Sequence, residues 1–338
     1  MATTRPPSGG PHDDWLIYRG NGEPHDGISR LPDPPPWRRF DQEGPRMGAV
    51  ERAVSYRPAP NVVEMVNAAI YLRRPLLVTG KPGTGKSTLA YNVAYELRLG
   101  RVLEWPITSR ATLEEGLYKY DAIGRLHETS LRQAGAPEAP AQIPDIGRYI
   151  RLGPLGTALL PWERPRVLLI DELDKSDIDL PNDLLNVFEE GGFGIPELER
   201  LPEDQATVEV MTADGDGRVP VTRGQVRCTA FPIVIITSNG EREFPPAFLR
   251  RCIRLAIEAP DPELLAEIVE AHLGDQGRED RDEIIREFLD RRRRRGDLAT
   301  DQLLNAIYLT TSGARPPSEA RRSLLESILA PLNATEPG

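Results

Sequence analysis

One stretch of the chain reads Gly80-Lys81-Pro82-Gly83-Thr84-Gly85-Lys86-Ser87, a complete P-loop of the pattern G-x-x-x-x-G-K-S. A short apolar run at 76–78 precedes it, and a helical segment follows from Thr88 to Leu99 and ends at Gly100. A strand, a glycine-rich loop and a helix in this order aim backbone N–H groups and a helix N-terminus at phosphates. The stretch therefore predicts a phosphate-binding loop in an α/β fold; the alternative is an ordinary glycine-rich turn.

The positions of this loop have separate expected roles around a nucleotide. Its glycines let the backbone wrap closely around the anion, and Lys86 is expected to reach the β- and γ-phosphates. The Ser87 hydroxyl is placed to bind Mg²⁺. The residues that we expect to contact the nucleotide are Gly80, Pro82, Gly83, Thr84, Gly85, Lys86, Ser87 and Thr88.

A second apolar run, at 167–170, ends in two acidic residues, Asp171 and Glu172. A continuous apolar run of this length is typical of a buried parallel strand, and ligands of open α/β sheets bind at the carboxyl ends of strands. We therefore expect Asp171 to hold the metal together with Ser87, and Glu172 to orient or deprotonate the attacking water. A strand that ends in a solvated acidic turn is the alternative.

Composition limits the class of protein. The formal net charge of −10 over 338 residues argues against a general nucleic-acid-binding surface. The sequence has no apolar run of about 18 residues, and residues 1–7 lack the apolar core of a secretory signal. We therefore expect a cytoplasmic protein without a membrane partner. The two cysteines, Cys228 and Cys252, lack metal-binding spacing and are expected to be buried thiols.

The composition changes along the chain and predicts three parts. Residues 1–48 are rich in Pro and Gly and too poor in apolar residues for a core of their own. We expect an irregular N-terminal extension that docks on the rest of the protein or on a partner; free disorder is the alternative. Residues 49–259 carry the P-loop and the strands. Residues 260–338 contain four amphipathic helical segments, which predict a small all-α lid.

Two inserts are expected within the α/β part. Between Lys86 and Asp171 lie 84 residues, more than one β-α-β step needs, so we place an insert with little regular pattern at about 107–152. At about 206–226, two β-rich runs flank Asp-Gly dipeptides and predict a hairpin. The first insert also contains side chains suited to anchor a contact with another protein, namely Tyr118, Tyr120, Tyr149 and Ile150.

Three further motifs lie toward the C-terminus. They are Ile235-Ile236-Thr237-Ser238-Asn239, Phe248-Leu249-Arg250-Arg251-Cys252 and Gly313-Ala314-Arg315-Pro316-Pro317. Together with the P-loop and the Asp-Glu strand, they resemble the sensor 1, arginine-finger and sensor 2 motifs of the AAA+ ATPases. The resemblance covers about residues 50–330.

Within that superfamily the chain resembles the MoxR branch. The sequence Gly153-Pro154-Leu155 and the run Leu-Ile-Asp-Glu-Leu-Asp-Lys at 169–175 are similar to sequences of that branch. The insert at 107–152 is similar to its helix-2 insert, and the hairpin at 206–226 to its pre-sensor-1 insert. The resemblance implies an AAA+ parallel-sheet domain with an α-helical lid, which binds ATP and Mg²⁺.

The resemblance also implies residues that act in trans. Glu172 and Asn239 would act on the nucleotide of their own subunit, and Arg315 would cover it from the lid. Arg251 would reach the γ-phosphate of a neighbouring subunit; we prefer it to the adjacent Arg250 because it directly precedes the expected strand start at 252–253. Because such a site is incomplete in a monomer, the resemblance implies a homo-oligomeric ring, as in the hexamers of this family.

Three hypotheses about function stay open at this point. The first is a MoxR-like motor that remodels a client protein; the resemblance implies clients with von Willebrand A domains. The second is an ATP- or GTP-using motor of a nucleic-acid-processing complex, such as a restriction or defence system, and the acidic net charge argues against it. The third is a slow, nucleotide-gated scaffold, and the presence of Glu172 argues against it.

An arginine run at 291–295 also invites a nucleic-acid interpretation. Its acidic neighbours, Asp290 and Asp297, and its place at the end of a helical segment favour a solvated helix terminus instead.

Overall fold

The computed structural model describes residues 16–18, 22, 24–35, 56, 58–135, 145–215, 217–273, 278–295, 298–311 and 316–330. Contacts between residues divide the chain into two compact units. The α/β unit comprises Tyr56–Gly80 and Gly85–Ile257, and the helical unit comprises Met1–Ser55, Lys81–Thr84 and Glu258–Gly338. Among the described helices, none is both long and apolar enough to cross a membrane.

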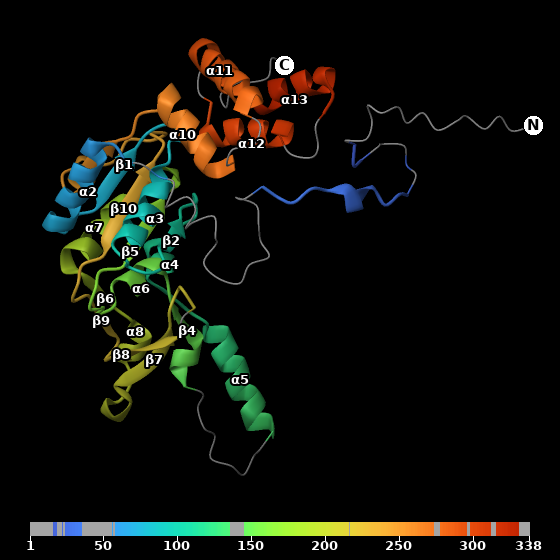
Figure 1. The fold of residues 1–338 in the computed structure, drawn as a ribbon. Coiled ribbons are helices and arrows are strands. Elements are labelled where there is room, and N and C mark those ends of the chain that lie inside the picture. The colour runs from blue at the N-terminus through green and yellow to red at the C-terminus, as the bar shows by residue number, and fades with distance from the viewer. Residues whose placement is uncertain are drawn as a thin grey trace, which may run out of the picture. The chain divides into compact units, whose positions relative to one another are not determined.

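The α/β unit is built on a five-stranded parallel sheet in the order β11-β1-β10-β5-β2. Figure 1 labels β1, β10, β5 and β2 of this sheet. The apolar runs at 76–78 and 167–170 form two of these strands, so the expected parallel α/β fold is confirmed. The five strands are β1 (Leu76–Thr79), β2 (Leu103–Pro106), β5 (Val167–Asp171), β10 (Ile233–Ser238) and β11 (Ile253–Ala256). Because they are parallel, the residues that follow β1, β5 and β10 meet at one edge of the sheet.

Helices cover both faces of this sheet. Leu76 and Val78 of β1 pack with α2 and α3 in one buried cluster, whereas Leu77 packs with α6 and α7 in a second cluster. This alternation is the two-residue period of a strand, and burial on both faces explains the continuous apolar sequence. The covering helices are α2 (Pro60–Leu72), α3 (Lys86–Glu96), α6 (Pro154–Ala158), α7 (Leu180–Glu190) and α9 (Pro246–Leu249).

The helix after the P-loop differs in its ends from the expected segment 88–99. It begins at Lys86, because Gly85 adopts a left-handed conformation (φ 83°) and caps it, and it ends at Glu96. The two P-loop residues that follow Gly85 are therefore already part of the first helical turn.

The two predicted inserts join in one six-stranded sheet, in the order β3-β4-β7-β8-β9-β6. The predicted hairpin is confirmed as the antiparallel pair β7–β8, and β7 pairs in parallel with β4 of the first insert at Arg151 and Met211. The strands are β3 (Tyr118–Tyr120), β4 (Ile150–Leu152), β6 (Gly192–Gly194), β7 (Thr207–Met211), β8 (Arg218–Thr222) and β9 (Gln225–Arg227).

The first insert is more regular than its sequence predicted, although its residues 136–144 lie outside the described part of the chain. The prediction that Tyr118 and Ile150 anchor another protein is wrong, because both side chains are buried in the core of the unit. The exposed apolar side chains are instead Ile123 and Leu126 of α5. The short elements of this region are α4 (Leu113–Leu117), α5 (Ala122–Gly135), η3 (Ile146–Tyr149), α8 (Pro196–Glu199) and η5 (Glu203–Gln205).

The four helical segments predicted after residue 260 form α10 (Pro262–Leu273), α11 (Arg278–Arg295), α12 (Thr300–Thr311) and α13 (Ser318–Ile328). They share a buried core that includes Leu265, Phe288, Leu303 and Ile307. In the same unit, the Tyr308 hydroxyl of α12 donates a hydrogen bond to the carbonyl of Asp33, in the N-terminal extension. The extension also contains η1 (Gly27–Arg30).

The arginine run lies at the C-terminal end of α11, as predicted, but it is not uniformly solvated. Arg291 pairs with Glu287 at 2.5 Å. Arg292 lies 5.7 Å from the centroid of the Phe288 ring and donates to the carbonyl of Pro260 at 2.8 Å. Burial, and then the adjacent Arg293, lower the pKa of Arg292.

The two cysteines differ in burial. Cys252 is buried, as expected, and desolvation raises the pKa of its thiol to about 12. Cys228 is only half-buried, so the prediction of a buried thiol is confirmed for Cys252 but not for Cys228.

Candidate nucleotide-binding site

The P-loop has the backbone conformation that its glycines permit. Gly80, Gly83 and Gly85 all have positive φ angles, of 157°, 76° and 83°. An L-residue with a side chain adopts such angles only with strain, so these glycines are required by the path of the loop. The Thr84 hydroxyl closes a turn by donating to the carbonyl of Lys81 at 2.9 Å. Pro82 and Gly83 are exposed, whereas Ser87 and Thr88 are half-buried in α3.

Lys86 lies inside the site and is only 7% exposed. Its Nζ donates to the carbonyl of Gly80 and to Oδ1 of Asn239, each at 2.8 Å. Burial lowers the pKa of this ammonium group, while Asp174, Asp171 and Glu172 act in the opposite direction. The lysine is thus surrounded by carboxylates that favour its charged form.

Asp171 joins the loop to the end of β5. Its Oδ1 accepts hydrogen bonds from the Ser87 hydroxyl at 2.7 Å and from the Thr237 hydroxyl at 2.6 Å. A hydroxyl beside a carboxylate is a hard oxygen donor set of the kind that Mg²⁺ prefers. The two residues therefore fit the predicted metal site, with nucleotide phosphates as further ligands. Among the described residues, no group of three or more His, Cys, Asp or Glu could hold a metal by itself.

Glu172 has a left-handed backbone conformation, with φ at 61°, and its side chain is held on both oxygens. Oε1 accepts a hydrogen bond from Nδ2 of Asn239 at 3.3 Å, and Oε2 pairs with Nζ of Lys175 at 2.6 Å. Asn239 therefore spans Lys86 and Glu172 with the two ends of one amide. The structure thus brings the predicted residues Lys86, Ser87, Asp171, Glu172 and Asn239 into one group.

Two residues of this group were not predicted as site residues. Thr237, fully buried in β10, donates to Asp171 and accepts from the backbone N–H of Glu172 at 2.8 Å. Asp174 is 3% exposed and accepts from the backbone N–H of Asn239 at 2.9 Å. The sequence contained a hint of each residue. Thr237 is a polar residue in an otherwise apolar strand, and Asp174 is a third acidic residue shortly after Asp171 and Glu172.

The predicted arginines lie outside this group. Arg250 and Arg251 are both exposed, at the end of α9 and before β11. Nε of Arg251 pairs with Oε1 of Glu189 at 2.5 Å. Arg315 lies outside the described residues.

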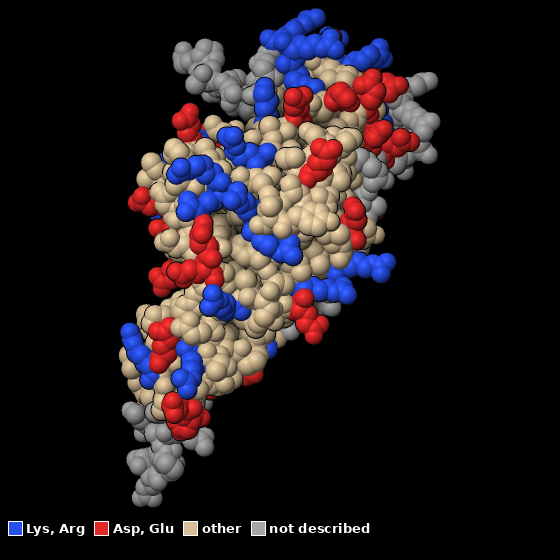
Figure 2. Space-filling view, turned by 90° about the vertical axis from the view of Figure 1, so that its left-hand side faces the viewer, with Lys and Arg blue, Asp and Glu red and all other residues tan. Residues whose placement is uncertain are grey.

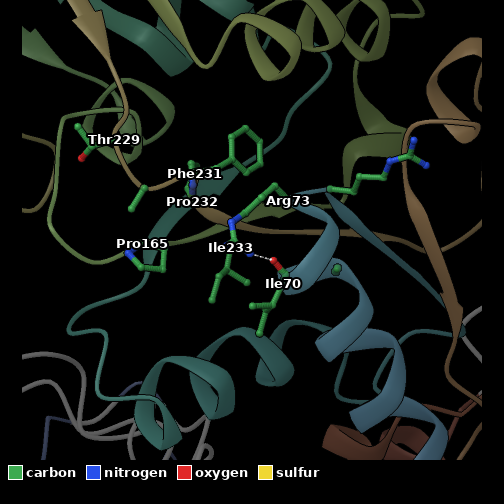
Figure 3. Close-up of a pocket in the computed structure, with 10 residues that line it drawn as sticks. Ile70, Arg73, Pro165, Thr229, Phe231, Pro232 and Ile233 are labelled. Atoms are coloured by element: carbon green, nitrogen blue, oxygen red, sulfur yellow. Dashed lines mark hydrogen bonds between the residues drawn. The ribbon is translucent and has the colours of Figure 1, made fainter.

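A cavity of about 230 Å³ lies at the other end of the sheet (Figure 3). Figure 3 shows Arg73 turned back to the carbonyl of Ile70, beside Pro232 and Ile233. Ile233 begins β10, whereas Asn239 follows the end of that strand, so the cavity is separate from the candidate site. It is lined by Ala69, Ile70, Arg73, Arg74, Pro165, Thr229, Ala230, Phe231, Pro232 and Ile233.

Comparison with known proteins agrees with this geometry. Residues 75–252 match the AAA domain of the dynein-related subfamily. Because the match covers more than half of the 338 residues, the chain belongs to this family of AAA+ ATPases. The matched region includes the P-loop, Asp171, Glu172, Asn239 and both arginines at 250 and 251. No curated protein sequence matches the chain.

Proposed function

We propose that this chain is an ATP-hydrolysing, MoxR-like AAA+ ring motor that remodels or activates a partner protein. The observation that carries the proposal is the group in which Asn239 spans Lys86 and Glu172 while Ser87 and Asp171 share a hydrogen bond. In this proposal residues 49–259 form the nucleotide-binding domain and 260–338 form the lid.

Each residue of the group has a task in hydrolysis. Lys86 binds the β- and γ-phosphates, and Ser87 and Asp171 hold Mg²⁺, which neutralises charge on the phosphate oxygens. Glu172 orients the attacking water and takes its proton, since it follows β5 directly and lies beside Asn239, whereas Asp171 is hydrogen-bonded to Ser87. Asn239 places Glu172 relative to Lys86 through its two hydrogen bonds.

The proposed assembly is a homo-oligomeric ring, with six subunits as the expected number. Arg251, or the adjacent Arg250, would supply a cation to the nucleotide of the next subunit, where it stabilises charge that develops in phosphoryl transfer. The exposure of both arginines supports an action on another molecule. Arg315 is proposed to cover the nucleotide of its own subunit.

A protein client is favoured over nucleic acid by the charges of the molecule. Figure 2 shows basic and acidic side chains interspersed on the face in view. In the arginine run, Arg291 and Arg292 already have partners within the helical unit. A surface that tracks phosphates needs clustered, available cations. The MoxR resemblance of the inserts supports a client with a von Willebrand A domain, and exposed Ile123 and Leu126 suit protein contact.

The proposal is tested by measuring ATP turnover of the wild type and of Glu172→Gln. We expect the variant to bind ATP while its turnover falls by at least about 100-fold, because the water loses its orienting carboxylate. Asp183→Asn, an exposed acid on α7, is the matched control and should keep wild-type turnover. Wild-type turnover in Glu172→Gln would contradict the assignment.

The client class is tested in the same assay. A purified von Willebrand A domain protein should change the turnover, whereas DNA and RNA at physiological salt should not. Steep, salt-sensitive stimulation by nucleic acid would instead favour the motor of a nucleic-acid-processing complex.

A further inference from the structure

A buried carboxylate lies beside the group described above. Asp174 belongs to η4 (Leu173–Lys175), which follows Glu172 directly, and it is 3% exposed. Its Oδ2 accepts hydrogen bonds from the backbone N–H groups of Asn239 at 2.9 Å and Glu241 at 3.0 Å. Its Oδ1 is buried and has no hydrogen-bond partner among the described residues.

These hydrogen bonds hold the turn that follows β10. Pairing of β10 with β1 ends at Ser238, so the next N–H groups have no partner in the sheet. Asp174 takes two of them, and the N–H of Gly240 between them donates to the Ser238 hydroxyl at 3.0 Å. Gly240 has a φ of 81°, which lets the chain turn sharply enough for one carboxylate oxygen to reach both neighbours.

The turn determines where the Asn239 side chain points. Its amide meets Nζ of Lys86 and Oε1 of Glu172, two groups on different elements, and it does so only with its backbone in one position. Catalytic groups tolerate displacements of about 0.5 Å before their geometry is lost. Freedom in the turn would therefore separate Asn239 from at least one of its two partners.

The burial of Asp174 is not explained by packing alone. A buried charge costs free energy unless it is fully hydrogen-bonded, and here one oxygen has no described partner. An apolar residue of similar size would fill the same space without that cost. Two features account for the carboxylate: Oδ2 accepts hydrogen bonds from two backbone N–H groups, and the negative charge favours the charged form of the nearby Lys86.

We propose that Asp174 is a positioning residue for hydrolysis, which holds the turn 238–241 so that Asn239 reaches both Lys86 and Glu172. This inference rests on the proposed function, because it assigns Asp174 an effect on turnover. In this proposal Asp174 acts through Asn239, whose amide contacts both Lys86 and Glu172.

The test compares Asp174→Ala and Asp174→Asn with Asn239→Ala and with the double variant Asp174→Ala/Asn239→Ala. We expect Asp174→Ala to lower kcat by at least about 30-fold while the Kd for a fluorescent ATP analogue stays within about threefold. Asp174→Asn keeps an oxygen that can accept both bonds, so its kcat should stay within about threefold of wild type. The double variant should be no slower than Asn239→Ala, because the two residues act as one unit.

A second measurement does not depend on activity. Amide hydrogen exchange at Asn239 and Glu241 should become at least about tenfold faster in Asp174→Ala but not in Asp174→Asn. Unchanged exchange in Asp174→Ala, unchanged kcat, or losses that add in the double variant would overturn the role of Asp174. A wild type that hydrolyses no ATP would overturn the proposed function instead, and the exchange rates would still decide whether Asp174 holds the turn.

Discussion

Arg251 is held by Glu189 of the same chain, with 2.5 Å between Nε and Oε1. Its Nη1 also donates to the carbonyl of Ala247 at 3.3 Å. The side chain of Arg250, by contrast, is exposed and makes no hydrogen bond or ion pair with the described residues. An arginine that acts on a neighbouring nucleotide has to leave such partners, so we expect the pair with Glu189 to oppose the release of Arg251.

Mixing two inactive variants tests whether Arg251 acts in trans. Arg251→Ala and Glu172→Gln subunits should each be inactive alone and regain activity in mixed rings. In an equal mixture, about one interface in four joins an intact Arg251 to an intact Glu172, so activity should reach about a quarter of wild type. Absence of rescue, with co-assembly shown by co-purification of differently tagged subunits, would point to Arg250 or to a role within one subunit.

Removing the charge of Glu189 should release Arg251. Both side chains are about half exposed, and exposed ion pairs are worth up to about 1 kcal/mol, or about fivefold in an equilibrium. We therefore expect Glu189→Gln to raise basal ATP turnover by about two- to fivefold at low salt, and less at high salt. Glu190→Gln, at the adjacent exposed glutamate, is the control. If both variants raised ATP turnover equally, the ion pair between Glu189 and Arg251 would not be what restrains Arg251.

Nucleotide binding should depend on Lys86. Lys86→Ala removes the ammonium group that pairs with the phosphates, and a charged hydrogen bond of this kind is worth about 3 kcal/mol, or about 100-fold in Kd. Calorimetry with ATP and Mg²⁺ measures the loss directly. Lys119→Ala, at an exposed lysine paired with Glu115, should bind ATP like the wild type. Tight binding by Lys86→Ala would contradict the P-loop assignment.

The central sheet could be predicted from the sequence because burial on both faces leaves a continuous apolar run in each strand, as at 76–78 and 167–170. The P-loop could be predicted from its sequence motif, and Asp171 and Glu172 from their position directly after an apolar run. The bond between Thr237 and Asp171 could not, because it exists only where β10 pairs with β5, with Ile236 opposite Ile170. Asp174 was missed for the same reason, since its partners lie after β10.

The sheet of the inserts was not predicted because its strands are short and its pairing is distant in sequence. β3, β4, β6 and β9 each contain three residues, too few for a two-residue period to show. The parallel contact of β4 with β7 joins Arg151 to Met211, and only tertiary structure brings these residues together. The hairpin of β7 and β8 could be predicted because its turn residues lie between two adjacent runs.

The loop between β7 and β8 is anchored to the core by a mostly buried ion pair. Nη2 of Arg166, just before β5, lies 2.8 Å from Oδ2 of Asp214, and the two side chains are 15% and 5% exposed. Arg166 also donates to the carbonyl of Arg101 at 3.1 Å and lies 5.3 Å from the centroid of the Trp162 ring. The pair therefore ties the second insert to the start of the strand that carries Asp171.

Breaking this pair from one side should destabilise the fold. Arg166→Met keeps much of the side-chain volume but removes the guanidinium that pairs with the buried Asp214 carboxylate, so we expect the free energy of unfolding to fall by about 3 kcal/mol. Urea denaturation measures this change. The control is Arg223→Met, directly after β8. The side chains of Arg223 and its partner Glu203 are 69% and 90% exposed, so this pair should contribute less than about 1 kcal/mol. If the two variants lost equal stability, the Arg166–Asp214 pair would not be what anchors the loop.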